Sequence, residues 1–172
     1  MKRHIVLVGL PGSGKTTVGQ LVATRLACTF VDVDAVLARR EAKPIALIFA
    51  EKGEPAFREM ERKEAESALG TPPTVIAPGA GWAAQPGAIA AAKPRAFVVY
   101  LRTRPETAAQ RAAPEGTRPL LMGEDPVARM RQLLKEREPF YQQAHSQVDT
   151  DRQGADQVAI EVVRLAQTSA GW

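Results

Sequence analysis

Cysteine is almost absent from this sequence of 172 residues, which contains one, Cys28. A single thiol cannot form an internal disulfide, and we interpret Cys28 as a small packing residue rather than a nucleophile. Low use of cysteine is typical of proteins in a reducing compartment. The sequence therefore predicts a cytoplasmic protein without disulfide bonds.

Long hydrophobic runs and clusters of basic residues are also missing. No stretch approaches the ~20 apolar residues that a membrane span needs. The apolar run near the N-terminus breaks at Gly12 and Lys15, which does not fit a secretory signal. The formal net charge is +4, but no basic run exceeds a pair such as Arg39-Arg40. We therefore expect anionic small molecules as partners, with no membrane and no nucleic acid.

The most informative segment is Gly9-Leu10-Pro11-Gly12-Ser13-Gly14-Lys15-Thr16. Its spacing is G-x-x-x-x-G-K-T, and it lies between an apolar run at 5–8 and a helical pattern at 17–23, the context expected of a phosphate-binding P-loop. Glycines let the backbone N–H groups point at phosphate oxygens, and the following helix adds its positive N-terminal end. The sequence therefore predicts that a nucleoside triphosphate binds to Gly12, Ser13, Gly14, Lys15, Thr16 and Thr17.

Apolar runs alternate with helical patterns along the whole chain, which favours a parallel sheet covered by helices on both faces. We expect strands at 5–8, 30–34, 74–77, 96–101 and 147–149. The predicted fold class is α/β, a three-layer α/β/α P-loop fold with a five-stranded parallel sheet. No repeat or linker divides the chain, so we expect one domain over residues 1–172. Residues 113–125 have the composition of a mobile lid, and helices at about 35–69 are expected to bind the acceptor.

Two acidic residues, Asp32 and Asp34, end the second predicted strand. Period-two spacing would place both carboxylates on one face of the strand end. One carboxylate could hold Mg²⁺ through water, and the other could orient or deprotonate a hydroxyl nucleophile. The alternative is that these acids only cap the next helix.

Arg58 and Glu61 are three residues apart on a long charged helix, a spacing that lets the carboxylate brace the guanidinium. A braced arginine can bind a substrate carboxylate with two hydrogen bonds. The alternative is an ordinary ion pair on a solvated helix face.

Five motifs occur in an order that resembles the shikimate kinase family, within the nucleoside-monophosphate-kinase-like P-loop enzymes. The resemblance spans about residues 5–150 and implies that ATP phosphorylates the 3-hydroxyl of shikimate. The motifs are G-x-x-x-x-G-K-T, D-x-D at Asp32 and Asp34, F-x-x-x-G-E-x-x-F-R-x-x-E from Phe49 to Glu61, R-P-L-L from Arg118, and R-x-P-x-Y from Arg137 to Tyr141.

The resemblance also implies roles on the nucleotide side. Lys15 would hold the ATP phosphates, and Arg118 would reach over them when the lid closes. Arg111 would stack on the adenine. Thr16 would bind Mg²⁺, with Asp32 supporting the metal through water.

On the acceptor side, the resemblance makes Asp34 the residue that grips the shikimate hydroxyls and serves as base. Arg58 and Arg137 would clamp the shikimate carboxylate, with Glu61 bracing Arg58. Residues expected to line the ring or the loop beside it are Phe49, Phe57, Gly79, Ala80 and Gly81.

The sequence departs from the family pattern at Gly79-Ala80-Gly81, where three consecutive glycines are usual. If Ala80 needs a positive φ or faces the acceptor ring, the acceptor or its affinity changes. Trp82 either lines the pocket or packs elsewhere. Two other functions therefore stay open. The first is a P-loop kinase whose acceptor is a nucleotide or another hydroxylated carboxylate such as gluconate. The second is a non-catalytic regulatory module that binds ATP. We expect a monomer in either case.

Overall fold

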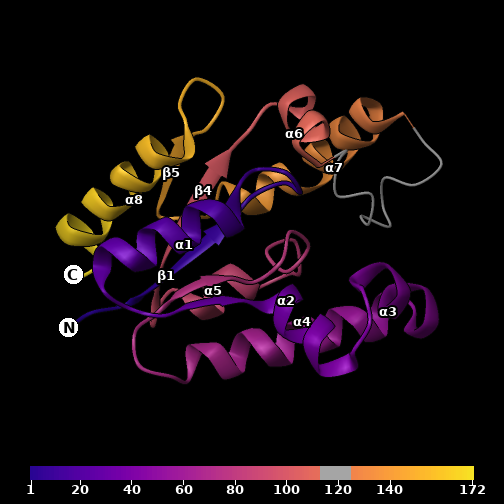
Figure 1. The fold of residues 1–172 in the computed structure, drawn as a ribbon, viewed down its shortest axis with the longest axis horizontal. Coiled ribbons are helices and arrows are strands. Elements are labelled where there is room, and N and C mark those ends of the chain that lie inside the picture. Colours follow the sequence, from indigo (N-terminus) through magenta and orange to yellow (C-terminus); the bar gives the residue numbers. More distant parts are fainter. Residues whose placement is uncertain (113–124) are drawn as a thin grey trace.

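The structure, a computed structural model, describes residues 1–112 and 125–172. Five strands alternate with helices in these ranges (Figure 1). The predicted lid, except Asp125, lies outside the described residues, as does Arg118. The strands are β1 (His4–Val8), β2 (Phe30–Asp32), β3 (Val75–Ala77), β4 (Ala96–Arg102) and β5 (Ser146–Asp149). The helices are α1 (Lys15–Leu26), α2 (Val33–Glu41), α3 (Ile45–Lys52), α4 (Glu54–Leu69), α5 (Ala88–Ala92), α6 (Pro105–Ala112), α7 (Pro126–Tyr141) and α8 (Ala155–Ser169).

The five strands form one sheet in the order β2-β3-β1-β4-β5, and every neighbouring pair is parallel. Val6 at the centre of β1 pairs with Ile76 on one side and Val98 on the other. The predicted α/β fold with a five-stranded parallel sheet is therefore confirmed. Because all strands run the same way, the loops that follow them meet at one edge, where ligands of such sheets bind.

Each face of the sheet carries its own apolar core, so the fold has three layers (Figure 1). On one face, Val18 of α1 and Val162 of α8 pack against the alternate β1 residues Ile5 and Leu7. Helices α2 to α7 supply apolar residues to the core on the other face. None of the helices within 1–112 and 125–172 is long and apolar enough to cross a membrane.

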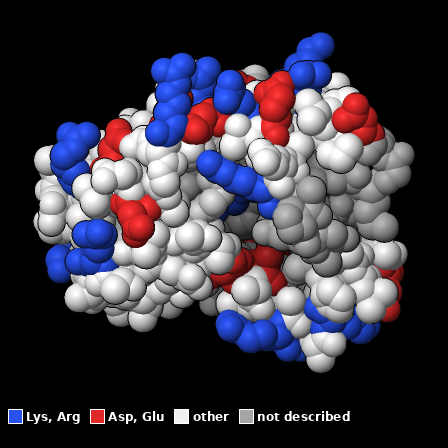
Figure 2. Space-filling model, turned by 45° about the horizontal axis from the view of Figure 1, so that its top comes forward, with Lys and Arg blue, Asp and Glu red and all other residues white. Residues whose placement is uncertain are grey.

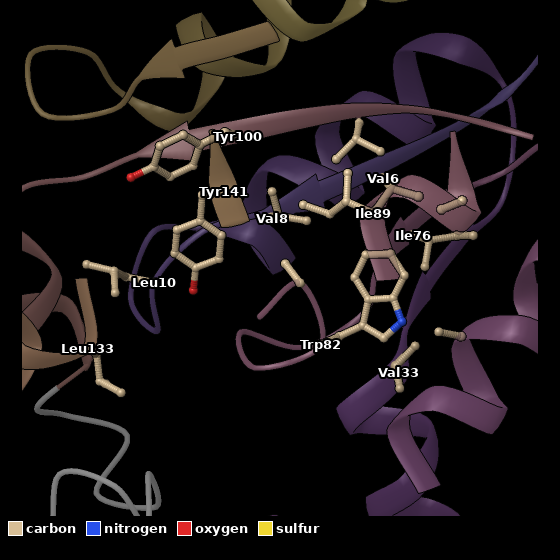
Figure 3. Close-up of a cluster of buried hydrophobic side chains, with 14 of the residues drawn as sticks. Val6, Val8, Leu10, Val33, Ile76, Trp82, Ile89, Tyr100, Leu133 and Tyr141 are labelled. Carbon is tan, nitrogen blue, oxygen red and sulfur yellow. The ribbon is translucent and has the colours of Figure 1, made fainter. Parts of the chain in front are cut away.

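Trp82 packs in this second core rather than lining a cavity. Its side chain is 5% exposed and lies among Val33, Ile76 and Ile89 (Figure 3). The indole adds a large apolar surface that holds the segment after β3 against the sheet. The position of Trp82 thus favours the packing alternative over a role in the pocket.

The second strand is shorter than the sequence predicts. It ends at Asp32, and Val33 already begins α2. The Asp32 carboxylate accepts a hydrogen bond from the backbone N–H of Ala35 at 3.1 Å, which caps the helix and starts it two residues early. Asp34 therefore lies in the first turn of a helix, and the expectation that both acids share a strand face is wrong.

His4 joins β1 to the end of α4. Its Nδ1 accepts a hydrogen bond from the backbone N–H of Thr74 at 3.2 Å, and its Nε2 lies 3.1 Å from the carbonyl oxygen of Leu69. This arrangement requires the neutral ring, because a protonated Nδ1 cannot accept. Burial lowers the pKa of His4 below its usual 6.5.

We expect His4 to make the protein less stable in acid. Below pH 6.5 the unfolded chain takes up a proton that the folded chain refuses, so the free energy of unfolding falls as the pH drops from 6.5 towards the lowered pKa of the folded state, below which the loss levels off. Urea unfolding at pH 7.5 and 5.5 should show a loss of up to about 1 kcal/mol from this group. A His4→Gln variant should lose less between the two pH values, and an equal loss would contradict the assignment.

Candidate active site

The P-loop runs from β1 into α1, as the sequence predicts. Gly14 has a φ of 93° and precedes the first helical residue, Lys15, so a side chain there would be strained. The Lys15 ammonium lies back across the loop and donates to the carbonyl oxygens of Gly9 (2.9 Å) and Leu10 (2.7 Å). It also lies 3.2 Å from the Ser13 hydroxyl. The loop therefore holds one positive charge at the N-terminus of a helix, the arrangement that binds phosphate.

Asp32 connects the P-loop to the acceptor helices. One of its oxygens caps α2, and the other accepts a hydrogen bond from the Thr16 hydroxyl at 2.7 Å. The helix cap predicted for Asp32 is therefore present, together with a hydrogen bond to the P-loop, and its role towards Mg²⁺ stays a prediction. A change at this carboxylate would reach both the phosphate loop and α2.

A cavity of about 150 Å³ opens where the loops after β1, β2 and β3 meet. Figure 2 shows a hollow in this side of the molecule, with acidic and basic side chains on its walls. The cavity is the junction that parallel topology predicts for a ligand site. It is lined by Lys15, Thr16, Asp32, Asp34, Ala35, Ala38, Ile45, Ala77, Gly79 and Ala80.

Behind this cavity, the carboxylates of Asp34 and Glu61 come together against Gly79. A methyl group on Gly79 would stand 3.1 Å from Asp34 Oδ1 and closer still to Glu61 Oε2, so only glycine fits. The Glu61 side chain is 2% exposed. Burial, together with the nearby Asp34 charge, raises the pKa of Glu61 to about 8. Near pH 7 the pair therefore retains a proton, which reduces the repulsion between the two acids.

Arg58 projects from α4 beside this pair. Its guanidinium donates to Glu61 Oε1 at 2.5 Å and lies 3.5 Å from Glu54 Oε1. It also sits near the rings of Phe49 and Phe57, at 6.0 and 5.5 Å from their centroids. The predicted brace between Arg58 and Glu61 is present, and these contacts hold the guanidinium in place. Phe57 itself is 3% exposed, so its ring supports Arg58 from within the core.

The Gly79-Ala80-Gly81 loop requires glycine at its first and third positions only. Gly79 has a φ of 96°, whereas Ala80 lies outside the left-handed region. A methyl group on Gly81 would stand 2.5 Å from the Cζ atom of Arg58. Ala80 is therefore free of backbone strain, and it lines the cavity together with Gly79.

Arg137 comes to this region from α7 and is 7% exposed. Among the described residues, its Nη1 is buried without a hydrogen-bond partner. A buried guanidinium with an unsatisfied N–H group is costly unless a ligand supplies the acceptor. Arg137 therefore has the property expected of an anion-binding side chain.

A second cavity, of about 210 Å³, lies on the other side of the P-loop, between Gly14, Thr17 and the loop after β5. Arg111 forms one wall and donates to the hydroxyl and the carbonyl oxygen of Thr150, at 3.3 and 3.0 Å. The opposite wall comes from residues 153–155 and Val158. The sequence assigns Arg111 and Thr17 to the nucleotide but leaves contacts near residues 150–155 open, because nothing in the loop after β5 has a distinctive pattern.

Thr16 and Asp32 have the chemistry that suits Mg²⁺. Both offer hard oxygen atoms, which lie 2.7 Å apart at the mouth of the P-loop. Mg²⁺ usually keeps several waters and takes only one or two protein oxygens beside substrate phosphates. No group of three or more potential metal-binding side chains occurs among the described residues, and a magnesium–nucleotide site does not need one.

Comparisons with known proteins agree on one family. The family described as shikimate kinase matches residues 11–167. A shikimate kinase from Symbiobacterium thermophilum is 41% identical over 167 residues, covering 95% of this chain and 96% of that protein. One from Caldanaerobacter subterraneus is 38% identical and covers 94% and 95%. A shikimate kinase from Acinetobacter baumannii, solved in complex with shikimate, superimposes with a TM-score of 0.92 at 35% identity, covering 98% and 94% of the two chains.

Proposed function

Because this chain belongs to the shikimate kinase family, we propose that it transfers the γ-phosphoryl group of ATP to the 3-hydroxyl of shikimate. The products are ADP and shikimate 3-phosphate. The observation that carries the acceptor assignment is the braced Arg58 beside Asp34, at the edge of the P-loop cavity. This pair offers a cation for a carboxylate and a carboxylate for hydroxyl groups.

On the nucleotide side, the P-loop holds the phosphates and Arg111 flanks the adenine. Lys15 exchanges its contacts with the Gly9 and Leu10 carbonyls for the β- and γ-phosphates. Phosphoryl transfer depends mainly on positioning and on neutralising charge, so this ammonium is the principal catalytic group of the described chain. Arg118 lies outside the described residues, and its role over the phosphates stays a prediction from the sequence.

On the acceptor side, Arg58 and Arg137 bind the shikimate carboxylate. Asp34 accepts hydrogen bonds from the ring hydroxyls. It takes the proton of the 3-hydroxyl while the oxygen of that hydroxyl bonds to the γ-phosphorus of ATP and the bond from this phosphorus to ADP breaks. Glu61, which retains a proton near neutral pH, leaves the charge of Arg58 available to the substrate. Phe49 and Phe57 hold Arg58 against the pocket.

Magnesium is the metal that this site would use. Thr16 would bind it directly and Asp32 through water, and it would neutralise phosphate charge. In the metal's absence, the Thr16–Asp32 hydrogen bond keeps the two oxygens together.

Turnover with a panel of acceptors tests this function. The protein is incubated with Mg-ATP and shikimate, quinate, gluconate or nucleoside monophosphates, and release of ADP is measured. Turnover that depends on shikimate supports the proposal. Turnover with gluconate or a nucleotide but not with shikimate would show that the acceptor is another molecule. An absence of turnover with every acceptor would favour the non-catalytic regulatory module.

The glycine loop gives a second prediction. Gly81→Ala should push the Arg58 guanidinium out of place and raise the KM for shikimate by about tenfold, the effect of weakening a charged hydrogen bond by ~1.4 kcal/mol. Ala80→Gly removes a methyl group that no backbone strain opposes, so its KM should stay within about twofold of wild type. Initial rates across shikimate concentrations measure both. Equal KM values for the two variants would show that the contact between Gly81 and Arg58 has no role.

We also infer that residues 1–172 work as one kinase domain and as a monomer. The free thiol of Cys28 and the use of ATP fit a cytoplasmic protein that needs neither nucleic acid nor membrane. Sedimentation with and without both substrates would measure the mass.

A further inference from the structure

Tyr141, the last residue of α7, belongs to a motif noted in the sequence but has no part in the function described so far. Its side chain is 0% exposed, and its hydroxyl donates a hydrogen bond to the carbonyl oxygen of Ala80 at 3.0 Å. Figure 3 shows the ring reaching from α7 between the sheet and the loops at its edge. A buried phenol is placed to hold two separate elements together, because breaking the bond leaves both groups unsatisfied.

The loop that Tyr141 holds is in contact with three residues of the acceptor site. Gly79 packs against the carboxylates of Asp34 and Glu61, and Gly81 packs against the guanidinium of Arg58. These contacts are too close for even a methyl group. A small displacement of the Ala80 carbonyl would therefore move the surface on which Arg58 rests.

The other end of the connection carries Arg137, one helical turn before Tyr141 on α7. The two residues are four apart, so their side chains share a helix face. Burial raises the pKa of Tyr141, and the charges of Arg137 and Arg58 oppose this rise. Tyr141 thus lies on the same helix as Arg137 and is bonded to the loop that packs against Arg58.

This last turn of α7 also has a weak point. Pro139 lies inside the helix, between Arg137 and Tyr141. Proline has no N–H group, so the helix lacks the hydrogen bond that residue 139 would otherwise donate. The tie from Tyr141 to Ala80 holds the turn to the loop where the helix's own hydrogen bonding is interrupted.

We propose that Tyr141 is a positioning residue that sets the separation of Arg58 and Arg137, and thereby the affinity for the acceptor carboxylate. It acts through the Ala80 carbonyl on the Arg58 side and through α7 on the Arg137 side. The proposal rests on the proposed function, since it takes a carboxylate as the ligand of both arginines.

The test compares Tyr141→Phe with Tyr100→Phe. The two buried rings lie 5.1 Å apart between centroids, but the Tyr100 hydroxyl points in another direction and donates to Glu138, outside the acceptor site (Figure 3). Each variant loses one hydroxyl from the same core. We expect Tyr141→Phe to raise the KM for shikimate by about tenfold, since it leaves a buried carbonyl unsatisfied, with kcat and the KM for ATP within about twofold. Tyr100→Phe should leave all three within about twofold.

The neutral methyl ester of shikimate separates positioning from a general structural effect. It has no carboxylate for the arginines, so its KM should be the same in wild type and in Tyr141→Phe within about twofold. An equal rise in KM for shikimate and for the ester would overturn the proposal, as would a tenfold rise in Tyr100→Phe. In an Arg137→Lys background, Tyr141→Phe should raise the KM for shikimate by less than about twofold further, because the two residues act together. A further tenfold rise in this KM would contradict the joint action of the two residues.

A second measurement does not depend on the folding of Tyr141→Phe. The chain has only two tyrosines, so 3-fluorotyrosine labelling gives two ¹⁹F signals, and the Tyr100→Phe variant retains the signal of Tyr141 alone. Shikimate should shift this signal, and the methyl ester should not. A signal unmoved by saturating shikimate would overturn the proposal. If the wild-type protein does not phosphorylate shikimate, the proposed function is wrong. The wild-type assay shows this before any variant is compared, so the two failures can be distinguished.

Discussion

Lys15→Ala is expected to lower kcat by about 10²–10³-fold with every acceptor, the effect of removing one preorganised charge from a transition state. The ammonium is the P-loop cation that the structure places over the phosphate-binding backbone. The KM for shikimate should change little, because the carboxylate of shikimate is assigned to Arg58 and Arg137, whereas Lys15 is assigned to the phosphates of ATP. Single-turnover rates with Mg-ATP measure the loss without interference from product release.

Lys43→Ala is a matched control for this variant. Lys43 is also a lysine at the start of a helical region, but it pairs with Glu51 on the exposed surface. Its removal should leave kcat unchanged, since exposed ion pairs contribute little. A kcat of Lys15→Ala within tenfold of wild type would contradict the catalytic role of the P-loop lysine. Such a result would revive the alternative of an ATP-binding module without catalysis.

Arg58→Ala is expected to raise the KM for shikimate by about a hundredfold, as the loss of one partner from a buried, hydrogen-bonded charge pair does. The effect on kcat should stay below about fivefold, because Arg58 holds the carboxylate at a distance from the reacting hydroxyl. Glu61 loses its cation in this variant, and burial will keep it protonated, so the fold should survive. Initial rates over a wide range of shikimate at saturating ATP give both constants.

Arg62→Ala is the control on the same helix. Arg62 lies one turn beyond Arg58, is 57% exposed and pairs with Glu59 in solvent. Its replacement should leave the KM for shikimate within about twofold. If Arg58→Ala saturates with shikimate like wild type, the carboxylate clamp is wrongly assigned. Arg58→Lys adds a further distinction, because it keeps the charge but loses the planar, two-point geometry, and an intermediate KM is expected.

Most of the fold and the nucleotide site could be predicted because local signals determine them. The P-loop is a continuous segment with a fixed spacing, and the alternation of apolar runs with helical patterns is enough to predict a parallel sheet. The brace between Arg58 and Glu61 was predictable for the same reason, since both lie within one helical turn. Each of these arguments depends on residues that are close in the sequence.

The features that sequence reasoning missed depend on contacts between distant residues. Asp34 lies in a helix because Asp32 caps that helix. The second contact of Asp32, with Thr16, could not be predicted because it joins residues 16 positions apart. The bond from Tyr141 to Ala80 joins residues 61 positions apart. That Ala80 avoids the left-handed region depends on backbone angles that residue type alone does not specify.

The glycine loop after β3 has a consequence for protein engineering. Of its three positions, the first has a positive φ and lies against the acids, and a side chain at the third would displace the guanidinium of Arg58. Position 80 already carries a methyl group without backbone strain, and it is one of the residues that line the cavity. A library intended to change which acceptors this scaffold takes should therefore diversify residue 80 first, and keep glycine fixed at 79 and 81.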